Sequence, residues 1–114
     1  MTFPTRAYKV LTGPQLAELL ATGRFAGAPI DLADGYIHLS TEAQLVETLL
    51  KHFAGQGDLW LATVDLVALH DHLRWERSRG GQLFPHVYAD LPLGAVIAYG
   101  PVEWLEGGTV RLPG

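Results

Sequence analysis

Residues Leu59 to Leu66 read Leu-Trp-Leu-Ala-Thr-Val-Asp-Leu, a nearly continuous apolar run. Branched and aromatic side chains of this kind favour a β-strand. A strand that is apolar on both faces has to be covered on both faces. The run therefore predicts the central strand of a sheet, with further elements packed against each side of it.

Two helices are predicted on the N-terminal side of this strand. The first begins at Thr12-Gly-Pro-Gln15, where Thr and Gln form a capping box, and ends at Gly23. The second begins at Thr41-Glu-Ala-Gln44 with the same capping pattern and ends before Gly55 and Gly57. Apolar residues at helical spacing support both helices: Leu16, Leu19 and Leu20 in the first, and Leu45, Val46, Leu49, Leu50 and Phe53 in the second.

The other segments predict short strands and one loop. We expect a loop over residues 27–35 and an edge or interrupted strand at Pro85, because proline lacks an N–H group. Residues 95–99 indicate a buried strand. The remaining strands are expected at residues 6–11, 36–39, 73–75 and 83–88, and in a hairpin of 102–105 with 109–112. Two main helices with six or seven strands, and no βαβ alternation, make a single α+β domain over residues 1–114.

Composition excludes several classes of protein. The chain has no Cys, which excludes thiol catalysis, disulfide scaffolds and cysteine-ligated zinc, and is compatible with a cytoplasmic location. Twelve acidic against eight basic residues argue against general nucleic-acid binding. No apolar run approaches the length of a membrane span, so we expect no membrane insertion. A hydrophobic content of 48% hints at a homodimer.

The charge is unevenly distributed. The segment Arg74 to Arg79 carries three Arg and one Glu, a net charge of +2, which leaves −6 on the rest of a chain whose total is −4. Such a segment, which includes Arg74 and Arg77, could concentrate a small anion. The alternative is a solvated turn whose Arg stems lie over apolar surface.

Histidines supply the first candidate site. His38 lies in the short strand next to a capped helix start, where an imidazole, the Ser40 hydroxyl and free backbone N–H groups can gather around a ligand. Phe84, His86 and Tyr88 alternate along one strand and would share a face on which a planar ligand could stack. Both patterns are also typical of packed structural residues, and the sequence leaves the two readings open.

A second group of residues predicts different chemistry. His70 and His72 with Glu76 could form a site of two histidines and one carboxylate for a metal-dependent enzyme, or an exposed polar connection. Trp75 beside Glu76 could raise the pKa of that carboxyl by desolvation and make it a general acid or base. The other reading is Trp75 in the core with Glu76 in water.

Four stretches together resemble a known bacterial family. They are Ala7-Tyr-Lys-Val-Leu-Thr12, Gly35-Tyr-Ile-His-Leu-Ser-Thr41, Leu73-Arg-Trp-Glu76 and Phe84-Pro-His-Val-Tyr88, the last being followed by Leu91-Pro-Leu and Ala95-Val. In order and spacing they resemble the family catalogued as domain of unknown function 952. That family implies a fold and no established activity.

The family's fold is similar to that of the ADP-ribosyltransferases, with the nearest echo in the catalytic half of the tRNA 2′-phosphotransferases. This resemblance implies a split sheet that holds NAD in a cleft, with NAD as a substrate. It places Tyr36, His38 and Ser40 in the cleft wall, near Tyr8, with His86 and Tyr88 on a neighbouring strand. Lys9 stands where the transferases have a histidine, and Gly35 where the phosphotransferases have an arginine.

Three functions follow as hypotheses. The first is NAD or nucleotide binding, with His38 or His86 orienting the ribose, the Arg74–Arg79 segment neutralising phosphate, and Glu76 stabilising an oxocarbenium-like centre. The second is a non-catalytic module for a small ligand or a protein partner. The third is the metal-dependent enzyme. The sequence does not decide whether the protein is an enzyme. The full set of candidate residues is Glu76, His38 and His86 for catalysis, and Tyr8, Tyr36, Ser40, Arg74, Trp75, Arg77, Phe84 and Tyr88 for ligand binding.

Overall fold

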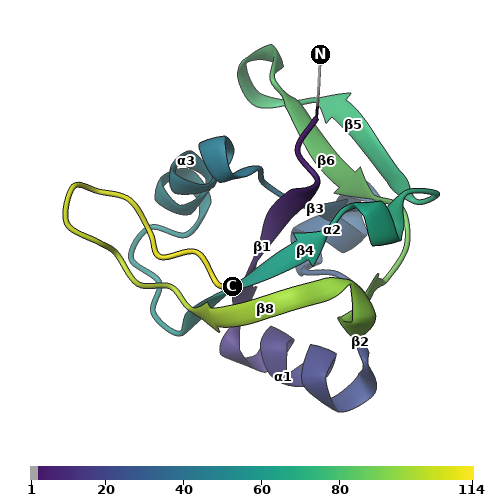
Figure 1. The fold of residues 1–114 in the computed structure, drawn as a ribbon, viewed down its shortest axis with the longest axis horizontal. Helices are drawn as coiled ribbons and strands as arrows, with labels where there is room; N and C mark the ends of the chain where they lie inside the picture. Colours follow the sequence, from purple (N-terminus) through teal and green to yellow (C-terminus); the bar gives the residue numbers. More distant parts are fainter. Residues whose placement is uncertain (1–2) are drawn as a thin grey trace.

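The computed structural model describes residues 3–114, apart from the side chain of Arg79. Three helices and eight strands run in the order β1 (Arg6–Thr12), α1 (Gly13–Thr22), β2 (Arg24–Phe25), α2 (Pro29–Asp34), β3 (Ile37–His38), α3 (Glu42–His52), β4 (Leu59–Asp65), β5 (Leu73–Arg77), β6 (Leu83–Val87), β7 (Leu91–Pro92) and β8 (Val96–Pro101) (Figure 1). The strands form three antiparallel sheets, β1-β4-β8, β2-β7 and β3-β6-β5. The predicted α+β class with mostly antiparallel pairing is confirmed.

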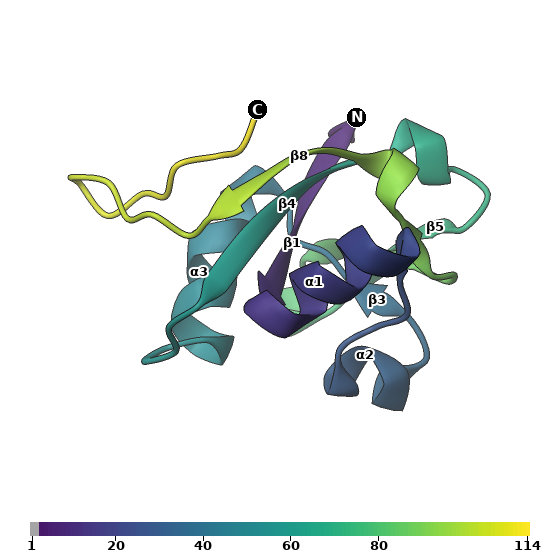
Figure 2. The same ribbon diagram turned by 90° about the horizontal axis from the view of Figure 1, so that it is seen from below.

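Strand β4 occupies the centre of its sheet, as its apolar run predicts. Leu11, Ala62 and Val64 belong to one buried cluster, to which α1 contributes Leu16 and Leu19. Figure 2 shows α1 lying against this side of β1 and β4. The opposite face contributes to a second cluster, in which α3 packs on the sheet through Leu45 and Leu49, beside Tyr8, Val10, Leu59 and Leu61. Both faces of β4 are therefore covered.

Local chemistry explains the two long helices. Thr12 accepts a hydrogen bond from the backbone of Gln15, whose side chain accepts in return from the Thr12 N–H group, and Gly23 ends α1 with φ of 81°. The Gln44 side chain accepts from the Thr41 N–H group at the start of α3. The predicted starts of both helices are confirmed.

Residues 27–35 are not the predicted loop, because α2 occupies most of them. Pro29 opens this six-residue helix, Asp31 accepts a hydrogen bond from the Ala28 N–H group, and Gly35 ends it with φ of 87°. Ile30 and Leu32 are both exposed, so the helix lacks the apolar stripe that normally reveals a helix in a sequence.

Strand β6 is also not an edge strand, because it pairs with β3 on one side and β5 on the other. The Pro85 carbonyl accepts from the Leu39 N–H group, which places the missing N–H of proline on the β3 side. Strand β3 has only two residues, so the lost hydrogen bond falls at its end, where it costs little.

Two C-terminal predictions need correction. Residues 95–99 are not fully buried, because β8 is an edge strand whose Ile97 and Tyr99 are each 45% exposed. The expected hairpin is reduced to one bridge, Trp104 with Val110, and to hydrogen bonds beside it. In the part of the chain that the structure describes, no helix is long and apolar enough to cross a membrane.

Candidate functional site

The small sheet β3-β6-β5 carries polar and aromatic side chains on one face. His86 lies opposite His38 on β3 and opposite Arg74 on β5, and directly opposed residues share a face. Glu76, Phe84 and Tyr88 follow on the same face by alternation. The other face packs on the core through Ile37, Leu73, Trp75 and Val87. The sheet thus presents its titratable side chains on one face and its core-packing side chains on the other.

His86 is held from two directions. Its Nδ1 lies 2.8 Å from Oε1 of Glu76, and the Tyr88 hydroxyl donates to the same oxygen at 2.7 Å. The Tyr36 ring stacks on the His86 ring, with centroids 4.1 Å apart and an interplanar angle of 15°. His86 is only 2% exposed, so these contacts fix its ring in a buried position.

The expected rise in the pKa of Glu76 is wrong. Hydrogen bonds from Tyr88 and His86 stabilise the carboxylate and lower the pKa of Glu76 below its usual value. The hydrogen bond that Tyr88 donates to Glu76 raises the pKa of Tyr88, and burial raises it further. Trp75 does not desolvate Glu76, because it lies on the opposite face of β5 and stacks on Phe3 with centroids 4.6 Å apart.

His38 has a carboxylate at each ring nitrogen. Nδ1 lies 2.6 Å from Oδ1 of Asp31, and Nε2 lies 2.9 Å from Oδ2 of Asp34. An ionised carboxylate only accepts hydrogen bonds, so a ring that satisfies both must donate from both nitrogens. The His38 ring meets the His86 ring edge to face, with centroids 5.4 Å apart.

Asp31 joins α2 to two strands. Its carboxylate accepts from the Lys9 ammonium at 2.9 Å, the Ala28 N–H group at 2.8 Å and the His38 N–H group at 3.1 Å. Burial alone would raise the pKa of Asp31, but the His38 hydrogen bond and the Lys9 charge outweigh it and lower that pKa to about 2. Burial lowers the pKa of Lys9, against the opposing effect of Asp31.

Beside this network lies a cavity of about 760 Å³, called here the central cavity. This volume is in the range of small-molecule sites. Five of the residues singled out in the sequence line it although they come from separate segments: Tyr8, His38, Ser40, Phe84 and His86. The rest of the lining is Lys9, Val10, Thr12, Gln15, Ala28, Pro29, Ile30, Asp34, Leu39, Thr48, His52, Phe53, Gln56 and Ser78.

Strand β1 and the segment after β3 form one wall of the central cavity. Tyr8 and Ser40 exchange two backbone hydrogen bonds, of 2.7 and 2.9 Å. The Ser40 hydroxyl lies 2.8 Å from that of Thr48 on α3. Burial raises the pKa of Tyr8. Strand β1, the segment after β3 and helix α3 therefore hold this wall together through hydrogen bonds.

The other predicted ligand-binding residues lie outside the central cavity. Tyr36, Tyr88, Glu76 and Arg74 gather on the far side of the two histidines, where the Arg74 guanidinium lies 5.2 Å from the centre of the Tyr88 ring. Trp75 and Arg77 project from the opposite face of β5, and Arg77 donates to the Gly81 carbonyl of its own turn. Of the described side chains in the basic segment, only that of Ser78 lines the cavity; the Arg79 side chain is outside the described part of the structure.

His70 and His72 do not lie on a strand, because they fall in the turn between the 3₁₀ segment Val67–Leu69 and β5. The His70 side chain is 78% exposed and contacts Asp71. Among the described residues no group of three His, Asp or Glu side chains is arranged to hold a metal ion. The predicted triad with Glu76 is therefore not formed.

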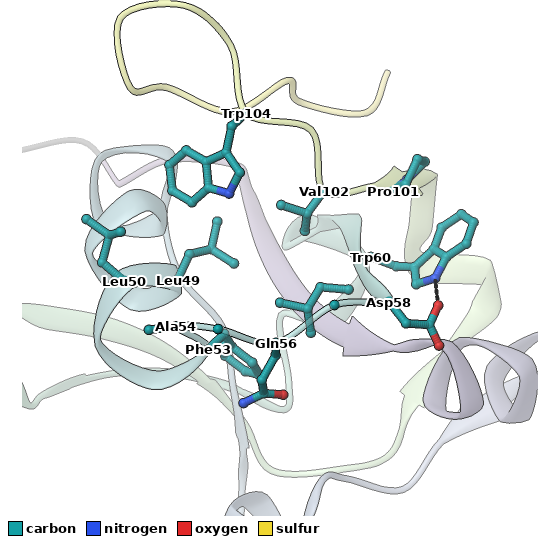
Figure 3. A pocket seen from close by; sticks show the side chains of 13 residues that line it. Leu49, Leu50, Phe53, Ala54, Gln56, Asp58, Trp60, Pro101, Val102 and Trp104 are labelled. Carbon is teal, nitrogen blue, oxygen red and sulfur yellow. Dashed lines mark hydrogen bonds between the residues drawn. The ribbon is translucent and has the colours of Figure 1, made fainter.

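A second cavity, of about 470 Å³, lies between the end of α3 and the start of β4 (Figure 3). Leu49, Leu50 and Trp104 line one side of it. The one carboxylate in its wall, that of Asp58, accepts a hydrogen bond from the Trp60 indole at 3.1 Å. This wall brings no acid–base groups together, whereas His38 and His86 meet in the wall of the central cavity, so the central cavity is the better candidate site.

Sequence reasoning missed three residues of the site: Lys9, Asp31 and Asp34. Asp31 and Asp34 fall in the segment read as a loop, and Lys9 was considered only as a departure from the transferase pattern. A signal for Asp31 was present, since Pro29, Asp31 and Gly35 stand at the positions that open and close a short helix. Nothing in the sequence linked Asp31 to Lys9, 22 residues away.

The fold and the site define a small α+β protein with a cavity beside an antiparallel sheet and two histidines in its wall. The chain belongs to the family described as "Protein of unknown function (DUF952)", whose sequence model matches residues 10–99, and the predicted family is confirmed. No curated protein matches the chain. The resemblance to ADP-ribosyltransferases stays a prediction.

Solved structures of one bacterial protein have the same fold. One is the crystal structure of protein CC0527 from Caulobacter crescentus, whose sequence is 41% identical to this chain. The two structures match with a TM-score of 0.85 over 95% of each chain. The solution NMR structure of CC0527 is also 41% identical, with a TM-score of 0.79 over 94% of this chain and 91% of that one.

Proposed function

We propose that the protein binds a small nucleotide-type ligand of the NAD class in the central cavity. One observation carries the proposal: Tyr8, His38, Ser40, Phe84 and His86 line one cavity although they come from separate segments. The sequence indicates each of these five residues for ligand binding or catalysis. A binding site requires such residues to converge on one cavity, and these five do.

The wall of the central cavity supports a planar ligand with polar substituents. Phe84 and Tyr8 offer aromatic surface, and Ser40 and His86 offer polar groups between them. Arg74, on the same face of the sheet as His86, supplies an exposed positive charge. The aromatic and polar groups of the wall suit a heteroaromatic ring inside the cavity, and Arg74, which lies outside the wall, adds positive charge to the same face of the sheet.

The position of Glu76 supports binding more directly than catalysis. Glu76 is not part of the cavity wall, and its carboxylate contacts the wall residue His86. A carboxylate outside the wall is less well placed to contact a bound ribose than the residues that line the cavity. The second hypothesis, a non-catalytic module for a small ligand, shares this cavity and differs only in turnover.

Isothermal titration calorimetry with NAD, ADP-ribose and nicotinamide tests the proposal. We expect binding of at least one of them, and chromatography of the mixture reports whether nicotinamide is released. Two charge-matched variants then locate the site. Ile30→Asp places a carboxylate on the cavity wall, and Leu32→Asp places it on the same helix outside the wall. Both parent residues are exposed, so neither variant disturbs the core.

We expect Ile30→Asp to weaken binding of the anionic NAD or ADP-ribose about fivefold relative to Leu32→Asp, through like-charge repulsion worth about 1 kcal/mol. No heat with any of the three ligands at millimolar concentration would exclude the proposed function. Equal binding by the two variants would place the ligand somewhere other than the central cavity.

A further inference from the structure

His38 and His86 look equivalent in the sequence, since each lies in a short strand two residues from an aromatic residue. In the structure they are paired across β3 and β6, and both line the central cavity. Their ring nitrogens, however, have different partners. This difference determines which of the two can accept a proton or a hydrogen bond from a ligand.

The two nitrogens of His38 are both engaged. Asp31 lies at Nδ1 and Asp34 at Nε2, and each carboxylate requires a donor. A His38 ring that keeps both hydrogen bonds donates from both nitrogens and has no lone pair to offer. Asp31 is itself fixed by the buried Lys9, so this arrangement is part of the way α2 is attached to the sheet.

His86 is engaged at one nitrogen. Glu76 accepts from Nδ1, which fixes the ring proton on that atom in the neutral tautomer and leaves a lone pair on Nε2. Among the side chains that the structure describes, none forms a hydrogen bond with Nε2. No described side-chain nitrogen or oxygen that is shut off from solvent lacks a partner. Nε2 is thus open to space, and the space that His86 lines is the central cavity.

The surroundings of His86 keep the ring in this orientation. Tyr36 stacks on one face, and Tyr88 donates to the same Glu76 oxygen as His86 does. The other charged groups that face the ring are Arg74 on β5 and the edge of the His38 ring on β3. Asp31 and Asp34 form hydrogen bonds with the His38 ring, and Lys9 donates to the His38 carbonyl. These three residues therefore affect His86 through the position of His38.

We propose that Nε2 of His86, positioned by Glu76, is a proton acceptor of the central cavity, and that it selects ligands with a hydroxyl or N–H donor at that point. The ligand-selection part of this inference rests on the proposed function. The tautomer and the open nitrogen do not, because both are properties of the protein alone. His38, which the sequence analysis weighed as an equal candidate, is assigned to holding α2 and the wall.

Two measurements without a ligand test the assignment. Long-range ¹⁵N–¹H NMR spectra of the histidine rings near neutral pH should show His86 protonated on Nδ1 alone and His38 protonated on both nitrogens. Diethyl pyrocarbonate acylates an unprotonated imidazole nitrogen. It should modify His86 slowly, since that side chain is only 3% exposed, and leave His38 unmodified although that side chain is 31% exposed, as mapped by mass spectrometry. The exposed His70 and His72 serve as internal positive controls.

A proton on Nε2 of neutral His86, or modification of His38 in preference to His86, would overturn the assignment. These outcomes are independent of whether NAD or ADP-ribose binds, so they separate this inference from the proposed function. With a ligand that binds, we expect the rate of His86 modification to fall at least threefold while the rates at His70 and His72 stay unchanged. Binding without protection of His86 would overturn the ligand-selection part.

Discussion

Nζ of Lys9 lies 2.9 Å from Oδ2 of Asp31, and both side chains are buried. The same ammonium donates to the His38 carbonyl at 3.0 Å, so one charge pair joins β1, α2 and β3. A buried ion pair is a weak source of net stability, but the loss of one partner is expensive, because the other is left charged and unpaired. Since His38 and Lys9 also line the central cavity, the pair links the integrity of the fold to that of the site.

Replacing Asp31 tests this link. We expect Asp31→Asn to lower the free energy of unfolding by about 3–5 kcal/mol, because it leaves the Lys9 ammonium buried without a counter-charge. The control is Asp34→Asn, which removes a partly exposed carboxylate from the same histidine and should cost no more than about 1 kcal/mol. Denaturant unfolding measures both. Equal losses in the two variants would show that burial of the pair does not determine the effect.

The same carboxylate makes stability depend on pH. The pKa of Asp31 is about 2 in the folded protein, below the 3.8 expected for the unfolded chain. The stabilisation is therefore fully present above about pH 4 and is lost as the pH falls toward 2. The size of the shift corresponds to about 2 kcal/mol. Urea unfolding between pH 2 and pH 5 should show this slope in the wild type and a shallower one in Asp31→Asn; parallel slopes would contradict the assignment.

The hydroxyl of Tyr88 controls the ionisation of Glu76. Tyr88→Phe removes the main hydrogen bond that lowers the pKa of Glu76, and we expect that pKa to rise toward its ordinary value while staying below it, since His86 still donates. Carboxyl ¹³C NMR titration measures the change. Tyr99→Phe, a similarly exposed tyrosine on β8, should leave Glu76 unchanged. An unchanged Glu76 in Tyr88→Phe would mean that this hydroxyl is not its partner.

The sequence predicts those parts of the fold that depend on near neighbours. The capping boxes at Thr12 and Thr41 and the run at Leu59–Leu66 each specify an element through residues that lie within a few positions of one another. The shared face of Phe84, His86 and Tyr88 follows in the same way from the two-residue period of a strand. Of the residues on this face, Phe84 and His86 line the central cavity.

What the sequence could not predict depends on pairing between distant residues. Pro85 is compatible with a central strand only because β3 is two residues long, and nothing near Pro85 encodes the length of β3. Asp31 reads as a loop residue until Lys9 and His38 are placed beside it. The different roles of the two histidines likewise follow from which carboxylates the fold brings to each ring.

The variant His86→Phe tests the contribution of the His86 hydrogen bond to ligand binding while keeping a flat ring at this position. The variant keeps a flat ring for the stack on Tyr36 but loses the nitrogen that faces the central cavity, and Glu76, which is partly exposed, can be solvated in its place. For a NAD-class ligand that binds the wild type, we expect affinity to fall about threefold to tenfold, as the loss of one hydrogen bond predicts. His70→Phe makes the same substitution outside the central cavity and should bind like the wild type. Isothermal titration measures both, with circular dichroism to confirm the fold. Unchanged affinity in His86→Phe would mean that Nε2 does not contact the ligand.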